Sequence, residues 1–294
     1  MNPETEVCTL IGSKEGVAHF PMAFINPGDR VLVPDVGYPV YQSSTYFAGG
    51  EPLYYSLREK NGFLPDVAEL EKLVAQGRPK IFFFNSPNNP TAATASRELL
   101  ADLVRFCRKH SIIFAHDAAY SELYFDGKKP PSVFEVEGAR EIAIEFHSLS
   151  KTFNMTGWRL GFAVGNPELV AGLAHVKTNI DSGVFNAVQE AGTVALDEGD
   201  SWVDGLRTTY QERRDVLFAA LQKTSLHCLK PEATFYMWCR LPQGTGSEAY
   251  VMDLIRRAGV ISTPGSGFGT GGEGYVRFTL CNPVPVLKKV AEIL

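Results

Sequence analysis

The sequence predicts an α/β fold with a mostly parallel sheet sandwiched by helices, followed by a smaller C-terminal α+β unit. Short apolar stretches without polar alternation recur from about residue 8 to residue 200, which is typical of strands buried on both faces. Helical patterns separate these stretches, and that order favours parallel strands joined by crossover helices. The pattern changes near residue 200, so we expect one unit over residues 1–200 and a second over residues 201–294.

The individual elements follow from apolar spacing. The strands predicted for the first unit are residues 31–33, 52–55, 81–84, 112–115, 142–146 and 162–164. A helix is predicted over residues 97–110, because its apolar side chains recur on one face. In the second unit we expect a long helix over residues 202–226 and strands over residues 235–238 and 275–278. The glycine-rich stretch 265–272 opens no clear helix, so we interpret it as a mobile loop.

The composition narrows the class of protein. The chain has 294 residues, 45% of them hydrophobic, and a formal net charge of -5, which argues against nucleic acid as a partner. No apolar stretch approaches the ~20 residues needed to span a bilayer, so we expect no membrane association. The five cysteines are odd in number and form no C-x-x-C pair. We therefore expect a cytoplasmic location, with neither a disulfide framework nor a zinc site.

Lys151 is the most informative residue. It follows the predicted strand 142–146 and lies where that strand gives way to a loop, which is where open α/β sheets bind ligands. A lysine in such a crevice loses its proton more easily and can attack a carbonyl carbon. Ser148 and Ser150 precede it and Arg159 follows eight residues later, and these groups can hold a phosphate. An amine beside a phosphate site indicates pyridoxal 5'-phosphate (PLP), bound to Lys151 as a Schiff base.

Three residues at strand ends fit the ring of this cofactor. Asp117 would pair with the pyridine nitrogen and keep it protonated, although a carboxylate there is as often a helix cap. Tyr120 lies three residues later and would reach the phenolic oxygen of the ring. Asn89, in the run Asn-Ser-Pro-Asn-Asn-Pro-Thr, would donate a second hydrogen bond to that oxygen. The alternative for Asn89 is a role in a turn.

A phosphate cradle is predicted from three parts of the sheet edge. Ser13 and Lys14 lie in Gly-Ser-Lys-Glu-Gly at the start of a helical stretch, where backbone amides favour an anion. A serine before glutamate is also typical of a helix N-cap. Together with Ser148 and Arg159, whose guanidinium fork contacts two oxygens at once, these residues would hold the phosphate.

Two further residues have a functional and a structural interpretation. Tyr38 follows another predicted strand and would stack on the pyridine ring, although a buried core tyrosine is the commoner role. Arg277 lies within a predicted strand and needs a partner, because burying an unpaired charge is costly. That partner is either the α-carboxylate of a substrate or a structural Asp or Glu.

The order of these motifs resembles the class I/II aminotransferases of PLP fold type I, over nearly the whole chain. The motifs are Asn-Pro-Thr at 89–91, Asp-x-x-Tyr at 117–120, Ser-x-Ser-Lys at 148–151 and the arginines at 159 and 277. Within that family, residues 12–16 and 147–159 resemble the LL-diaminopimelate aminotransferase branch. The resemblance implies that Lys151 is the Schiff-base lysine and that the other residues hold the roles given above. It also implies a homodimer and a role in amino acid biosynthesis.

Two departures from the family pattern stand out. Ala92 follows Thr91 where family members usually have glycine, and alanine resists a positive φ. Only eleven residues precede the Gly-Ser-Lys loop, where relatives have a substantial segment that contributes to the small domain, to substrate contacts and to the partner's phosphate site. We therefore expect a more open active site and a less secure dimer. A fragment, a mis-started reading frame and a short homologue all fit the sequence.

The predicted reaction is transamination between an amino acid and a 2-oxo acid. The amino acid displaces Lys151 from PLP, and the freed amine of Lys151 then moves the α-proton. Asp117 stabilises the negative charge that develops. A PLP-dependent lyase of the same fold is an alternative, because the residues that bind the cofactor barely distinguish the two reactions. A truncated protein that binds PLP without turnover is the other alternative.

Overall fold

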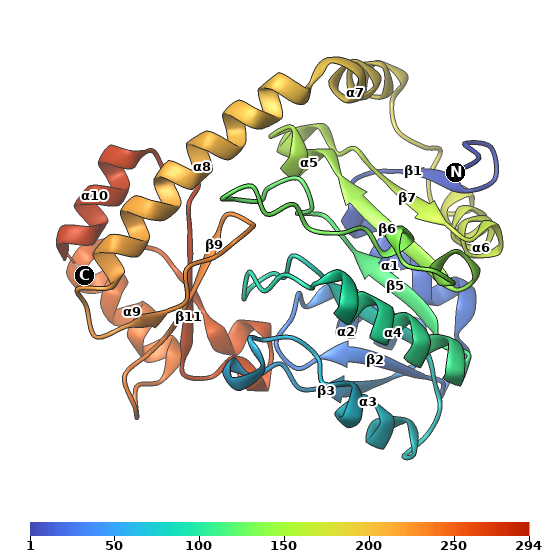
Figure 1. The fold of residues 1–294 in the computed structure, drawn as a ribbon, viewed down its shortest axis with the longest axis horizontal. Coiled ribbons are helices and arrows are strands. Elements are labelled where there is room, and N and C mark those ends of the chain that lie inside the picture. Colours follow the sequence, from blue (N-terminus) through green and yellow to red (C-terminus); the bar gives the residue numbers. More distant parts are fainter. Residues whose placement is uncertain (294) are drawn as a thin grey trace.

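The computed structural model describes residues 1–293 and confirms the predicted fold class. A seven-stranded, mostly parallel sheet lies between two layers of helices, and a four-stranded antiparallel sheet follows it in the chain (Figure 1). We call these the large sheet and the small sheet. The division at residue 200 stays a prediction, because one helix runs from the large sheet to the small one.

The large sheet has the strand order β1-β7-β6-β5-β4-β2-β3. Its strands are β1 (Val7–Leu10), β2 (Arg30–Pro34), β3 (Glu51–Tyr55), β4 (Pro79–Asn85), β5 (Ile113–Asp117), β6 (Ala143–Ser148) and β7 (Gly161–Gly165). Strands β3, β2, β4, β5 and β6 are parallel, whereas β7 is antiparallel to both β6 and β1. The strands predicted from the sequence are all present, and β1 is an additional edge strand.

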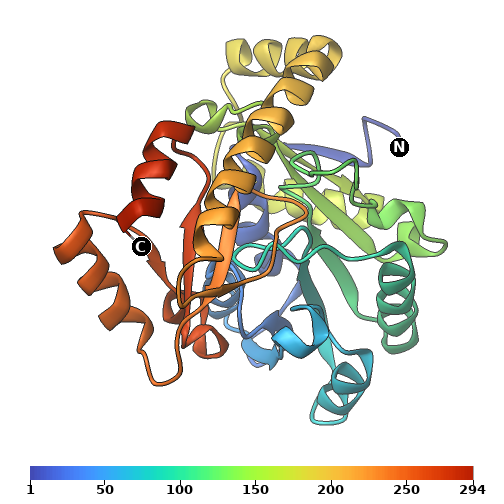
Figure 2. The same cartoon turned by 60° about the vertical axis from the view of Figure 1, so that its left-hand side comes forward.

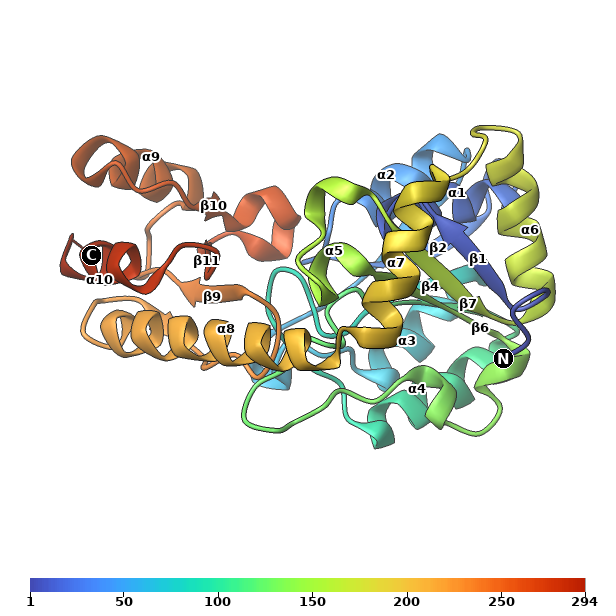
Figure 3. The same cartoon turned by 90° about the horizontal axis from the view of Figure 1, so that it is seen from above.

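Helices cover both faces of the large sheet (Figure 3). One face packs against α3 (Val67–Val74) and α4 (Arg97–His110), and the other packs against α1 (Ser13–Phe24), α2 (Val40–Phe47) and α6 (Pro167–Thr178). Alternate residues of one strand supply the two cores, since Phe82 and Phe84 face one layer while Ile81 and Phe83 face the other. The bounds of α4 coincide with the predicted helix.

The small sheet has the order β10-β11-β9-β8, and all its pairings are antiparallel. Its strands are β8 (His227–Cys228), β9 (Tyr236–Arg240), β10 (Thr263–Pro264) and β11 (Tyr275–Thr279). Helices α8 (Asp200–Leu221), α9 (Ser247–Ala258) and α10 (Val284–Ile293) pack around it. Helix α7 (Asn186–Glu198) lies beside the large sheet, and α8 continues from it along the small sheet (Figure 2). Helix α8 ends at Leu221, earlier than the predicted end at residue 226.

The stretch expected to be a mobile loop is packed against the large sheet. Residues Gly265–Phe268 and Thr270–Gly272 form two 3₁₀ turns, and Phe268 is buried. The N–H of Gly37 donates to the carbonyl of Phe268 at 2.9 Å, so the turns lie against the loop that carries Tyr38. This contact brings the small sheet to the edge of the large one.

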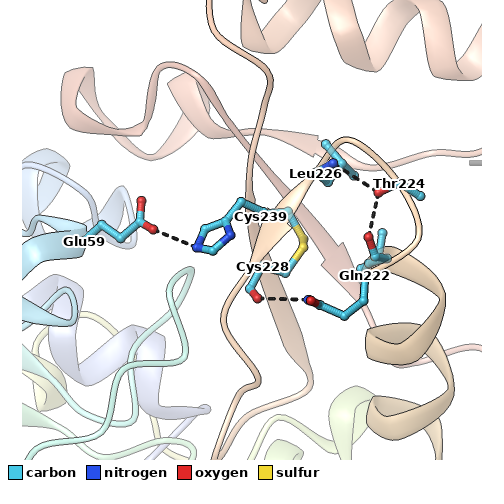
Figure 4. Close-up of a disulfide and its surroundings, with 8 residues drawn as sticks. Glu59, Gln222, Thr224, Leu226, Cys228 and Cys239 are labelled. Carbon is cyan, nitrogen blue, oxygen red and sulfur yellow. Dashed lines mark hydrogen bonds and ion pairs between the residues drawn. A yellow bond between two sulfur atoms is a disulfide. The ribbon is translucent and has the colours of Figure 1, made fainter.

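Cys228 and Cys239 form a disulfide (Figure 4), so the expectation of no disulfide is wrong for this pair. The two residues lie opposite each other on β8 and β9, with Cα atoms 4.4 Å apart. The spacing of the cysteines in the sequence does not predict the bond, because the pairing depends on the register of two strands rather than on a C-x-x-C motif. Cys8, Cys107 and Cys281 are free.

Two kinds of feature are absent from the part of the chain that the structure describes. Residues 1–293 contain no group of three or more His, Cys, Asp or Glu side chains that could hold a metal ion. Over the same residues, no helix is both long and apolar enough to cross a membrane.

Candidate active site

A cavity of about 270 Å³ lies at the carboxyl ends of β4, β5 and β6, the edge at which open α/β sheets bind ligands. Nine of the ten residues predicted for the site line it. These residues are Ser13, Lys14, Tyr38, Asn89, Asp117, Tyr120, Ser148, Lys151 and Arg159. The tenth, Arg277, reaches the cavity wall through a hydrogen bond to Asn89. The structure thus brings together residues that are spread over most of the chain.

Lys151 lies in α5 (Leu149–Thr152), a single turn of helix that follows β6 directly. Burial lowers the pKa of its amine, and the positive charge of Arg159 lowers it further. Its Nζ lies 5.6 Å from the ring centre of Phe235, next to the small sheet. An amine in this environment gives up its proton more readily than an exposed lysine, which is a requirement for a nucleophile or a general base.

Asp117 ends β5 and is buried. Its Oδ2 accepts a 2.6 Å hydrogen bond from the hydroxyl of Tyr41, and its Oδ1 accepts one from the N–H of Ala119. Burial raises the pKa of the Asp117 carboxyl, against the lowering effect of these hydrogen bonds and of nearby histidines. No helix follows Asp117 directly, so the helix-cap alternative is not observed.

Tyr41 is a site residue that the sequence analysis missed. It lies in the first turn of α2, three residues after Tyr38, which precedes the helix. It is buried, with its hydroxyl directed at Asp117. The signal was present in the run Gly-Tyr-Pro-Val-Tyr, because residues three apart at a helix start lie on the same face. Tyr38 itself is only half-buried and lines the cavity, which differs from the core-tyrosine alternative.

Asn89 lies in the loop after β4, and its N–H donates to Oδ1 of Asn85 at 2.7 Å. Asn85 also donates from Nδ2 to the carbonyl of Asp117 at 2.8 Å, so one amide side chain ties the loop to the end of β5. Asn89 can therefore belong to a turn and line the cavity at the same time. Ala92, three residues later, has φ 61°, so the loop keeps a left-handed residue although alanine occupies that position.

Arg277 lies in β11, and its guanidinium carbon is 4.0 Å from the ring centre of Tyr236 and 4.7 Å from that of Phe268. Nη1 donates to Oδ1 of Asn89 at 2.7 Å and Nη2 donates to the hydroxyl of Thr263, while Nε is buried without a partner. Burial lowers the pKa of this guanidinium. Among residues 1–293, no Asp or Glu lies within ion-pair distance of Arg277.

The hydroxyl of Tyr120 lies 3.1 Å from that of Tyr236, which enters the cavity from β9. Burial raises the pKa of Tyr120 well above its ordinary value, and the neighbouring Tyr236 raises it further. The sequence analysis placed Tyr236 in a strand but assigned it no role. A strand residue gives no local signal of which cavity it faces.

The residues predicted to hold a phosphate meet at the start of α1. Ser13 and Lys14 are the first residues of this helix, and Gly12 before them has φ 75° and makes no side-chain cap. The N-cap alternative for Ser13 is therefore not observed. The guanidinium of Arg159 packs so closely over Gly12 that a side chain at Gly12 would collide with it. The start of a helix, two cations and the hydroxyls of Ser13, Ser148 and Ser150 lie together here and could hold an anion.

The cavity fits PLP, since it has cations and hydroxyls for a phosphate at one end, a buried carboxylate for the ring nitrogen at the other, and Lys151 on its wall. A family model described as "Aminotransferase class I and II" matches residues 1–294. The chain belongs to the class I and II aminotransferases. It is thus a PLP-dependent enzyme that transfers an amino group, as the sequence motifs predicted.

Relatives and solved structures agree with this assignment. An LL-diaminopimelate aminotransferase of Nitratidesulfovibrio vulgaris (strain DSM 19637 / Miyazaki F) is 55% identical over 282 residues, which is 95% of this chain and 72% of the relative. That of Aquifex aeolicus (strain VF5) is 52% identical over 99% of this chain and 75% of its own. The structure of a probable N-succinyldiaminopimelate aminotransferase from Thermus thermophilus superposes with a TM-score of 0.94 at 36% identity, covering 100% of this chain and 79% of that one.

Proposed function

We propose that this aminotransferase takes the amino group of LL-diaminopimelate and passes it to a 2-oxo acid. The observation that carries the donor assignment is the 52–55% identity to LL-diaminopimelate aminotransferases over 95–99% of the chain. The guanidinium of Arg277 is partly buried and has no carboxylate partner among residues 1–293, which supports a substrate that brings a carboxylate into the cavity. The lyase alternative and the alternative without turnover are not favoured by these relatives.

We assign the cofactor contacts by position in the cavity. Ser13, Lys14, Ser148 and Arg159 would hold the phosphate, and Tyr38 would stack on the ring. Asn89 and Tyr120 would donate hydrogen bonds to the phenolic oxygen, and Asp117 would accept one from the protonated ring nitrogen. PLP, when bound, supplies an electron sink for the pair left behind as the α-proton departs.

The residues of the chain supply the remaining steps. Arg277 would bind the α-carboxylate and so fix the orientation of the α-carbon. Lys151 Nζ, with a pKa lowered by burial, would remove the α-proton and later return one, a role that contributes roughly 10²- to 10⁴-fold to rate. Asp117, held in place by Tyr41 and Ala119, would keep its negative charge directed at the ring.

Product analysis tests this assignment. The purified chain with PLP should convert LL-diaminopimelate only when a 2-oxo acid is present, and it should release a keto product without ammonia. Ammonia and a cleaved side chain would indicate the lyase. Turnover of other amino acids, but not of LL-diaminopimelate, would overturn the donor assignment and leave transamination intact.

We also infer that the enzyme is a homodimer. Large apolar side chains are exposed on α2 and between α6 and α7, with Phe47 77% and Phe185 75% accessible. Phe47 is the last residue of α2 and Phe185 directly precedes α7, and exposed apolar side chains of this size are typical of an interface. Light scattering should give about twice the 32.3 kDa of the chain, and Phe47→Glu or Phe185→Glu should lower that mass. A wild-type monomer would contradict the dimer.

Two finer assignments complete the proposal. Residues 1–200 would hold the cofactor and residues 201–294 would form a smaller domain, supported by the separate sheets of the two parts. Limited proteolysis should cut first near residue 200. Three free thiols (Cys8, Cys107 and Cys281) support a cytoplasmic location, whereas the Cys228–Cys239 disulfide counts against it, and cell fractionation tests the location.

A further inference from the structure

A buried charged cluster lies on the far side of β5 and β6 from the cavity. His116 and Glu145 are register partners on these parallel strands, with only 1% and 2% of their side chains exposed. His116 directly precedes Asp117, and Glu145 lies three residues before Ser148. No catalytic or binding role above uses either residue.

The hydrogen bonds of His116 fix the charge of its ring. Its Nδ1 lies 2.8 Å from Oε2 of Glu145, and its Nε2 lies 3.1 Å from the carbonyl oxygen of Ser86. A carbonyl oxygen only accepts hydrogen bonds, and an ionised carboxylate only accepts them too. With Glu145 ionised, both partners of the ring accept, so each ring nitrogen carries a hydrogen and His116 is an imidazolium. Its ring also stacks on Phe84, with centres 5.6 Å apart, and this contact favours a cation.

Glu145 is ionised in this arrangement. Burial alone would raise the pKa of its carboxyl, but hydrogen bonds from His116 and His147 outweigh burial and hold it far below its usual value. The carboxylate also accepts from the hydroxyl of Ser132 and the N–H of Val133. Hydrogen bonds donated to a carboxylate stabilise its ionised form, so these donors favour an ionised Glu145.

We propose that His116 is a positioning residue that remains an imidazolium and keeps Asp117 ionised at the end of β5. Asp117 is buried, and burial disfavours its charge. A cation on the adjacent residue offsets that cost, and the hydrogen bond to Glu145 keeps the ring of His116 protonated. His116 also holds Ser86, at the start of the loop that carries Asn89. The two proposed contacts to the cofactor ring, from Asp117 and from Asn89, thus both depend on His116.

The other groups around the cluster do not compete for this role. On β6, His147 Nε2 binds the second oxygen of Glu145 at 2.8 Å, and its ring stacks on Phe162. On β4 the neighbour is Phe84, and the segment after β5 contributes Ser132, so neither brings a charge. His147 is partly exposed, whereas His116 is sealed from solvent.

The charge of His116 can be measured directly in the cofactor-free protein. The chain has six histidines, and ¹⁵N spectra of their rings assign His116 by loss of its signals in His116→Gln. We expect hydrogen on both ring nitrogens between pH 7 and 8.5, because both of their partners accept hydrogen bonds. A ring with one bare nitrogen in that range would overturn the proposal. The measurement itself is made on the wild-type protein, and the variant serves only to assign the His116 signals.

A second measurement tests the effect on Asp117. In cofactor-free His116→Gln, the Asp117 carboxyl, followed by ¹³C, should titrate about one pH unit higher than in the wild type. His110→Gln is the matched control, because His110 pairs with Glu71 at 2.9 Å far from the cavity, and it should leave Asp117 unchanged. An unchanged Asp117 in His116→Gln would also overturn the proposal. The inference rests on the proposed role of Asp117, but both tests use protein without PLP, so their failure leaves the proposed reaction standing.

Discussion

The guanidinium of Arg277 donates a 2.7 Å hydrogen bond to the side-chain oxygen of Asn89, although the two residues are 188 positions apart. Arg277 belongs to the small sheet and Asn89 to the loop after β4 of the large sheet. The proposed carboxylate ligand and the proposed ring-oxygen ligand are therefore in direct contact. Substrate binding at Arg277 and cofactor binding at Asn89 would thus affect each other.

Replacing Arg277 should weaken substrate binding. In Arg277→Gln the KM for the amino donor should rise about 10- to 100-fold, because a charge-assisted hydrogen bond contributes about 1.5–3 kcal/mol. Steady-state kinetics of the loaded enzyme measure this change. Arg240→Gln is the matched control, since Arg240 lies on the same small sheet but is exposed and pairs with Glu59. Equal KM values for Arg277→Gln and the wild type would exclude Arg277 as the carboxylate ligand.

Tyr41→Phe should reduce turnover through Asp117. Loss of the 2.6 Å hydrogen bond removes support for the charged carboxylate, so the pKa of Asp117 should rise and kcat should fall about tenfold. Tyr55→Phe is the control, because Tyr55 is equally buried and donates one hydrogen bond to the carbonyl of Phe83. Both variants should lose about 1 kcal/mol of unfolding free energy, but only Tyr41→Phe should lose activity. Equal kcat in the two variants would remove Tyr41 from the site.

The reaction of Lys151 with PLP should have a shifted pH dependence. Burial and the charge of Arg159 both disfavour the protonated amine, so Lys151 should be neutral at a lower pH than an ordinary lysine of pKa 10.5. Stopped-flow absorbance after mixing the chain with PLP gives the rate at each pH. We expect the rate to level off below pH 10.5, whereas that of N-acetyl-lysine amide continues to rise. Identical profiles for the two amines would contradict the lowered pKa.

Reduction of the Cys228–Cys239 bond should destabilise the protein. The bond closes a loop with a sequence separation of 11 residues, and a loop of that size contributes about 3 kcal/mol. Urea unfolding with and without reductant measures the difference. The double variant Cys228→Ser/Cys239→Ser should not respond to reductant, while Cys281→Ser, at an exposed free cysteine, should respond like the wild type. A wild-type midpoint that reductant leaves unchanged would show that the bond does not stabilise the fold.

The sequence predicted the strands, the cavity position and nine cavity-lining residues, because each of these depends on local signals. Apolar runs define buried strands, and polar residues directly after them lie at one sheet edge. Asp117 and Lys151 were found in this way, at the ends of β5 and just after β6.

The features that were missed depend on tertiary contacts. Tyr236 faces the cavity only because the small sheet packs against the large one, and Cys228 meets Cys239 only through the register of β8 and β9. His116 contacts a carbonyl oxygen 30 residues away, that of Ser86. Apolar patterning specifies which residues are buried but not which partners they meet.

The most direct test of the account is the visible absorbance spectrum of the chain with PLP, compared with that of Lys151→Ala and the exposed-site control Lys223→Ala. We predict a bound-cofactor band in the wild type and in Lys223→Ala, and its conversion to the aminated cofactor on addition of LL-diaminopimelate. Lys151→Ala should show neither the band nor turnover. Turnover retained in Lys151→Ala would contradict the central role of this lysine.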